Sequence, residues 1–121
     1  MNKFKPNCTT KVTDRILVLE ENKCKCVFSN PQNNNLTKVI VDGCQITEGV
    51  KCDFLILDHK ENEYFVELKG KDIPHALEQL ESTIKQLSGT NNIQRTAIIV
   101  TSRYPSNDTT MQRAKVMFRK K

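Results

Sequence analysis

Two apolar segments joined by a short polar turn constrain the fold of this chain more than any other feature. Cys52 to Asp58 is almost continuously apolar, and Tyr64 to Gly70 follows it after the polar residues 60–63. A continuous apolar run is typical of a strand that is buried on both faces of a sheet. Two such runs on either side of a polar turn predict a β-hairpin near the centre of a sheet.

A helix and another buried strand are expected after this hairpin. Apolar residues recur at the helical period of 3.6, namely at Ile73, Ala76, Leu77, Leu80, Ile84 and Leu87. Asp72 is a suitable N-cap, Pro74 falls in the first turn, and Gly89 ends the helix. The apolar centre of Arg95 to Thr101 predicts the next strand.

The flanking segments complete the expected fold. Lys38 to Cys44 and Cys24 to Ser29 predict strands, whereas the residues around Ile16 to Glu20 suit a helix or a strand equally well. At the other end, Met111, Ala114 and Phe118 share one side of a basic helix predicted over residues 109–121. We therefore expect one α/β domain over residues 1–121, with a central mixed sheet flanked by helices and a core over about residues 38–100.

The charge of the chain suits a polyanionic partner without requiring one. It has 19 Lys and Arg against 14 Asp and Glu among 121 residues, a formal net charge of +5. Basic side chains that neutralise phosphates release counterions, which favours nucleic-acid binding. The candidate phosphate contacts are Lys71, Arg113, Lys115 and Arg119. A solvated basic surface is the alternative interpretation of the C-terminal residues among them.

The five cysteines and the N-terminal segment indicate a reducing compartment. No apolar export signal follows Met1, no segment is apolar enough to span a membrane, and an odd cysteine count makes a disulfide framework unexpected. We therefore expect a cytoplasmic protein that does not enter membranes. Cys24, Cys26, Cys44 and Cys52 raise a second hypothesis of a zinc-stabilised structural domain, but buried thiols are favoured.

A carboxylate pair and a lysine form the candidate site. Within Tyr64 to Lys69 the side chains alternate, so Glu67 and Lys69 share one face. Asp53 begins the partner strand and lies opposite Lys69 or opposite Glu67, depending on the register of the hairpin. A cross-strand salt bridge is the alternative, but charges in strands this apolar need a partner or a metal.

The chemistry of these side chains favours phosphodiester hydrolysis. Carboxylate oxygens are the ligands that Mg²⁺ and Mn²⁺ prefer. Such an ion polarises a phosphate and activates a water, and Lys69 is placed to assist that water.

The pattern resembles the PD-(D/E)XK nuclease superfamily. The matching features are Asp53, the motif Glu67-Leu68-Lys69 on the next strand, and the amphipathic helix that follows. The resemblance implies a restriction-endonuclease-like core of order αβββαβ, metal binding by Asp53 and Glu67, and catalysis by Lys69. It also implies a helix glutamine near the site, matched by Gln79, although Thr83 stands where some members have Tyr. Cys52 stands where the usual proline precedes the aspartate.

The resemblance further implies an acidic residue from a first helix. Glu21 is the expected third metal ligand, and Glu20 and Asp42 are the alternative carboxylates. Asp42, which precedes Gly43, is better explained as a turn residue. The expected function is a Mg²⁺- or Mn²⁺-dependent nuclease, with DNA favoured over RNA. The alternative is a catalytically inactive binding module, or a subunit of a larger nucleic-acid-processing or defence complex. A homodimer or a partner protein is then expected to supply recognition.

Overall fold

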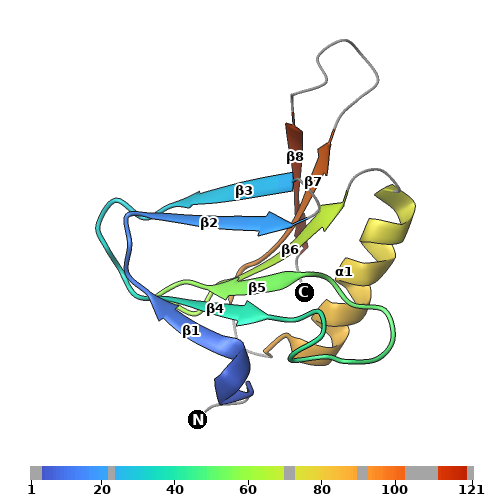
Figure 1. Ribbon diagram of the computed structural model, residues 1–121, viewed down its shortest axis with the longest axis horizontal. Coiled ribbons are helices and arrows are strands. Elements are labelled where there is room, and N and C mark those ends of the chain that lie inside the picture. The colour runs from blue at the N-terminus through green and yellow to red at the C-terminus, as the bar shows by residue number, and fades with distance from the viewer. Residues whose placement is uncertain (1–3, 22–23, 70–72, 90–92, 103–111, 120–121) are drawn as a thin grey trace.

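The computed structural model describes residues 4–21, 24–69, 73–89, 93–102 and 112–119 (Figure 1). For residues 69, 73, 101–102 and 112–119, only the backbone is described. The elements in chain order are η1 (Pro6–Cys8), β1 (Thr9–Val12), β2 (Ile16–Glu21), β3 (Cys24–Ser29), β4 (Leu36–Ile40), β5 (Phe54–Leu57), β6 (Glu63–Lys69), α1 (Ile73–Leu87), β7 (Arg95–Ser102) and β8 (Gln112–Arg119).

The main sheet has six strands in the order β1-β4-β5-β6-β7-β8. Neighbouring strands are antiparallel except β6 and β7, which are parallel and joined through α1. Parallel neighbours need a crossover of this kind, whereas β5 and β6 need only a tight turn. The prediction of an α/β fold with a mixed sheet is therefore confirmed. Strands β2 and β3 pair with each other in a separate two-stranded sheet.

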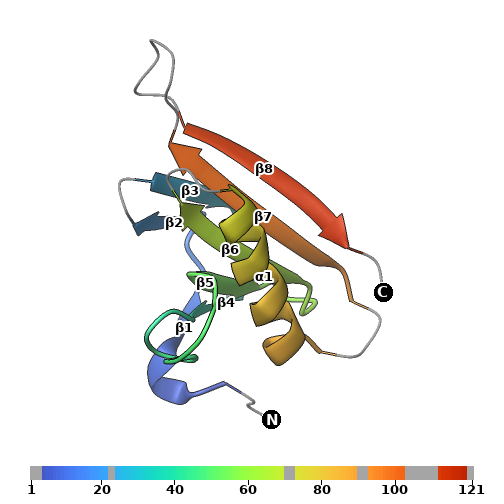
Figure 2. The ribbon, with the colours of Figure 1, turned by 90° about the vertical axis from the view of Figure 1, so that its right-hand side faces the viewer.

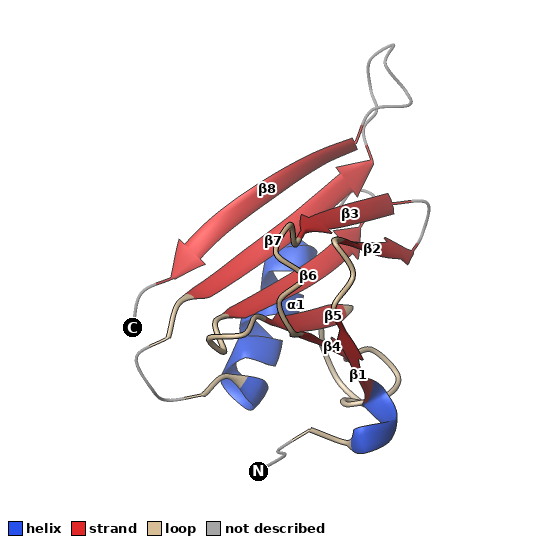
Figure 3. Cartoon of the chain, turned by 90° about the vertical axis from the view of Figure 1, so that its left-hand side faces the viewer, coloured by secondary structure: helices blue, strands red, loops and turns tan. Residues whose placement is uncertain are grey.

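The core has two layers because the central strands are buried on both faces. On β6, Phe65 packs in the cluster that includes Ala76 and Leu80 of α1, whereas Val66 and Leu68 pack in the cluster that includes the β2–β3 hairpin. Figure 2 shows α1 lying over the sheet, and Figure 3 views the sheet from the opposite side, with α1 behind the strands. This double burial explains why the strands read as continuous apolar runs.

The predicted β5–β6 hairpin is confirmed, and its register answers the question that the sequence leaves open. Phe54 pairs with Val66 at the end of the ladder, and the Asp53 amide also donates to the Val66 oxygen, so Asp53 lies beside the middle of β6 and not opposite Lys69. The turn is organised by Asp58, whose carboxylate accepts hydrogen bonds from the backbone amides of Lys60 and Asn62. An acidic side chain that bonds the backbone two residues on is a common device in tight turns.

Residues 16–21 form a strand, which decides between the two expected alternatives. Leu17 and Leu19 are buried, while Ile16 and Val18 are 59% and 43% exposed, so burial follows a period of two. Pairing with β3 uses the backbone groups that a helix would satisfy internally. The described residues before β4 contain only η1 and strands, so they do not show the first helix of the expected αβββαβ order.

The prediction of a C-terminal helix over residues 109–121 is wrong where the backbone is described. Residues 112–119 form β8, which pairs antiparallel with β7 along its whole length. The apolar spacing of Ala114 and Phe118 suits a helix, but Val116 between them also fits the period of a strand. Without β8, the apolar β7 would be the edge strand of the sheet. Pairing with β8 satisfies the backbone groups along that edge of β7. Residues 109–111 and 120–121 lie outside the described residues.

No disulfide framework was expected, but the structure contains one disulfide. Cys8 and Cys44 form a disulfide that links η1 to the turn after β4. An odd count excludes complete pairing but not one pair with three thiols, and Cys24, Cys26 and Cys52 are not in a disulfide. Disulfides are rare in reducing compartments, so this bond does not support the cytoplasmic expectation. Cys24 and Cys52 are fully buried, as the thiol interpretation predicts.

Candidate functional site

Asp53 is fixed at the junction of three strands. Its backbone oxygen accepts a hydrogen bond from the Val41 amide just after β4, at 3.0 Å. Its own amide donates to the Val66 oxygen at 3.1 Å, and its Oδ2 accepts from the Leu68 amide at 2.9 Å. These two contacts with β6 lie on either side of Glu67. The Asp53 side chain is only 6% exposed, so the position of its carboxylate is set by the backbone of the sheet.

Two further carboxylates gather at Asp53. Glu21 at the end of β2 and Asp42 in the turn after β4 each place an oxygen so that all three oxygens lie within 4.8 Å of one another. We call these three residues the carboxylate triad. Glu21 and Asp42 are exposed, whereas Asp53 is buried. The turn that carries Asp42 is tight, and Gly43 has a φ of +82°, a conformation that glycine adopts at little cost.

Glu67 lies beside the triad but does not belong to it. It is 2% exposed, and it occupies the same face of β6 as Phe65, towards α1. Cys52 lies close to both acids. Burial raises the pKa of the Cys52 thiol to about 12, and the negative charges of Glu67 and Asp53 contribute to the rise. The thiol therefore stays protonated and adds no charge near the two carboxylates.

Lys51 brings a positive charge to the triad. Its Nζ lies 3.9 Å from Asp42 Oδ1, and it donates a hydrogen bond to the Gly49 oxygen at 2.8 Å. The Lys51 side chain is 17% exposed, against 49% for that of Asp42. An ammonium beside several carboxylates reduces their mutual repulsion.

Helix α1 holds the loop that leads to Asp53. Gln79 Nε2 donates to the Lys51 oxygen at 2.9 Å, and Ser82 Oγ donates to the Val50 oxygen at 2.8 Å. The Cys52 amide in turn donates to Thr83 Oγ1 at 2.8 Å. We call these three contacts the loop clamp. Gln79, expected at the site, thus reaches the loop through its amide nitrogen, while its Oε1 is buried without a hydrogen bond from the described residues.

The other expected site residues are less completely described. Lys69 ends β6, where its backbone pairs with Thr101, but its side chain is outside the described part of the structure, as is Lys71 altogether. Arg113, Lys115 and Arg119 occupy alternate positions of β8, and only their backbone is described. His75 lies near the start of α1. It is exposed and contacts Glu78 at 3.4 Å on the first turns of α1.

A hollow of about 380 Å³ lies at the other end of the β5–β6 hairpin. It is lined by the end of β3, the loop after it and the Asp58 turn, and Phe28 and Tyr64 meet edge to face on its wall. The triad contributes no residue to this hollow, so the two features are separate parts of the surface.

The triad fits a hard divalent cation by ligand type and spacing. Oxygens bound to one Mg²⁺ at about 2.1 Å lie about 3.0 Å apart when adjacent and about 4.2 Å apart when opposite. Oxygens within 4.8 Å of one another need only small side-chain rotations to reach such positions. Asp53 would be the fixed ligand, and the exposed Glu21 and Asp42 are free to adjust. Three carboxylates without thiols or imidazoles favour Mg²⁺, Mn²⁺ or Ca²⁺ over zinc.

Comparison of the chain with models of protein families, with characterised proteins and with solved structures found no match. Among the described residues, none of the helices combines the length and apolar character needed to cross a membrane.

Proposed function

We propose that this protein is a metal-dependent nuclease related to the PD-(D/E)XK superfamily, with DNA favoured over RNA. The observation that carries the proposal is the position of Asp53. It is buried and hydrogen-bonded to Val66 and Leu68, on either side of Glu67 in the E-x-K strand, and two exposed carboxylates converge on it. A structural salt bridge would need only one carboxylate here, whereas a bound cation needs several oxygens.

The residues have distinct tasks in the proposed mechanism. Asp53, Glu21 and Asp42 would hold Mg²⁺ or Mn²⁺, which supplies Lewis acidity toward a phosphate oxygen. Glu67 contributes negative charge behind Asp53, and Lys69 at the end of the same strand is proposed to orient the attacking water. The loop clamp, which includes Gln79, keeps the Asp53 backbone in place. The basic residues of β8 are proposed to contact the nucleic-acid backbone.

Cleavage assays with matched variants test this function. Plasmid and single-stranded DNA are incubated with Mg²⁺ or Mn²⁺ and the wild type, Asp53→Asn, Glu67→Gln or Lys69→Ala. Asp53→Asn retains an oxygen that can accept from the Leu68 amide, so its fold is expected to survive. The control is Glu78→Gln, which removes a carboxylate that is 71% exposed on α1. Metal-dependent cutting that is lost in the three site variants and kept in the control supports the proposal.

A catalytically inactive binding module is the second candidate. The deep burial of Glu67 favours it, because a carboxylate that is 2% exposed and outside the triad has little access to a substrate. This candidate predicts no cutting of DNA or RNA by any variant, together with metal-independent binding to a nucleic acid or a partner protein.

A further inference from the structure

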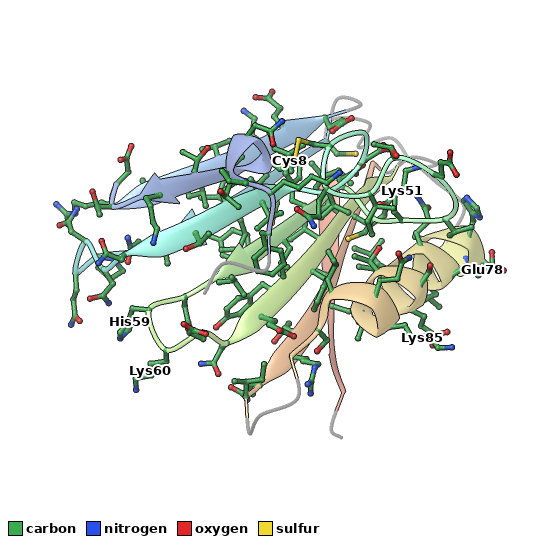
Figure 4. The ribbon with its side chains drawn as sticks, turned by 90° about the horizontal axis from the view of Figure 1, so that it is seen from below. Cys8, Lys51, His59, Lys60, Glu78 and Lys85 are labelled. Carbon is green, nitrogen blue, oxygen red and sulfur yellow. A yellow bond between two sulfur atoms is a disulfide. The ribbon has the colours of Figure 1, made fainter. Side chains whose placement is uncertain are left out.

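Lys51 is held in place at both ends. Its backbone oxygen accepts the hydrogen bond from Gln79 of the loop clamp, and its Nζ donates to the Gly49 oxygen. Lysine side chains at a surface normally extend into water, but this one is only 17% exposed. Figure 4 shows Lys51 at the end of the molecule opposite His59 and Lys60. The fold therefore fixes an ammonium beside the triad.

This ammonium has two opposite effects on ligands of the site. It lies 3.9 Å from Asp42 Oδ1, so it competes with a cation for that carboxylate and repels a cation bound there. An ammonium also has three N–H donors, and the Gly49 oxygen uses only one. The remaining donors suit a phosphate oxygen. A phosphate that lies between the cation and the ammonium would remove the repulsion.

We propose that Lys51 couples metal binding to phosphate binding at the triad. In the free protein, the Lys51 ammonium weakens the affinity of the triad for a divalent cation. When a phosphate of a nucleic acid arrives, it contacts both positive charges, and the cation and the phosphate bind more tightly together than either does alone. The inference rests on the proposed function, since it assigns a regulation to the same site. Coupling of this kind is reciprocal, so each ligand raises the affinity for the other by the same factor.

The first arm of the test measures metal binding alone. Titration calorimetry with Mn²⁺ compares the wild type with Lys51→Met, Lys51→Gln and Lys51→Arg. Met preserves the unbranched stem without the charge, and Gln provides a second neutral variant should Met impair folding. Both neutral variants are expected to bind Mn²⁺ about tenfold more tightly, from the repulsion between a divalent ion and a unit charge about 6 Å apart in water. Lys51→Arg retains the charge and should resemble the wild type.

The second arm measures the coupling. Fluorescence anisotropy follows binding of a labelled DNA duplex with and without Ca²⁺, which takes the same oxygen ligands as Mn²⁺. Ca²⁺ should strengthen duplex binding to the wild type several-fold, and this gain should be smaller in Lys51→Met, where only the direct contact between the cation and the phosphate remains. The matched control is Lys60→Gln, which removes the same charge from the exposed turn at the other end of the hairpin. It should keep the wild-type Mn²⁺ affinity and the Ca²⁺ gain.

The outcomes separate the inference from the proposed function. Equal or weaker Mn²⁺ binding by the neutral Lys51 variants would overturn the coupling while leaving the metal site intact. Absence of Mn²⁺ binding by the wild type and by every variant would overturn both. A Ca²⁺ gain that is as large in Lys51→Met as in the wild type would also overturn the coupling, whether or not the protein cuts DNA.

Discussion

Thr83 of the loop clamp offers a direct test of how α1 positions Asp53. Thr83 is 0% exposed, and its Oγ1 both donates to the Gln79 oxygen at 2.9 Å and accepts from the Cys52 amide at 2.8 Å. Thr83→Val keeps the shape of the side chain but removes the acceptor. The buried Cys52 amide then lacks its partner, and an unsatisfied buried group of this kind costs about 1–3 kcal/mol. The Gln79 oxygen should suffer less, because it belongs to the ladder of α1.

Urea denaturation of Thr83→Val and Thr83→Ser measures this contribution. Serine keeps the hydroxyl and loses one methyl, so its expected cost is about 1 kcal/mol, mainly from lost apolar burial. Valine should also weaken Mn²⁺ binding, because the Cys52 amide adjoins Asp53, whereas serine should leave that affinity unchanged. If valine costs no more than serine and binds Mn²⁺ as tightly as the wild type, the hydrogen bond from Cys52 does not position the site.

Three further predictions concern the fold around the site. Glu63→Ala should destabilise the protein by about 3–5 kcal/mol in urea denaturation, because the buried Arg95 guanidinium then loses the carboxylate that lies 3.3 Å from its Nε. A cost below about 1 kcal/mol would contradict this prediction. Cys8→Ser should cost about 4 kcal/mol in non-reducing buffer, since Cys8 and Cys44 close a loop with a sequence separation of 36, and the wild type in dithiothreitol should lose the same amount. Burial raises the pKa of Asp58, but hydrogen bonds from its turn outweigh burial and hold the pKa below its usual range. Its stabilisation is therefore complete above the unfolded value of about 3.9 and is lost as the pH falls through the lower folded value, so Asp58→Asn should flatten the acid side of a stability–pH profile.

The central part of the fold follows from local sequence patterns. Each of the three central elements has a sequence pattern that favours one type of secondary structure. The apolar runs around Phe54 and Val66 form the strands β5 and β6, and the stripe at the helical period forms α1, as predicted. Ile16–Glu21 and Gln112–Arg119 fit two periods, so local pattern could not decide them. Long-range pairing with β3 and β7 decides both in favour of strands.

The site was predictable only in part, for a related reason. Asp53 and Glu67 belong to the strongest strand pattern, and one hairpin brings Asp53 to the neighbours of Glu67 in β6. Asp42 has the sequence context of a turn, and it does lie in a turn, but the same turn also delivers its carboxylate to Asp53. Lys51 carries no signal in the sequence beyond its place two residues before Asp53. Its proximity to Asp42 depends on how two separate loops approach each other.

The position of Glu21 bears on the family resemblance more than the order of the elements does. The resemblance implies an acidic residue supplied by a first helix, and the described residues before β4 contain no such helix. Glu21 nevertheless reaches Asp53 from the last position of β2, in a hairpin that packs on the face of the sheet opposite α1. A metal constrains where ligand oxygens lie and not the element that carries them. The resemblance is therefore tested more sharply by Glu21→Gln than by topology, since loss of Mn²⁺ binding in that variant would give Glu21 the function that the helix acid was expected to have.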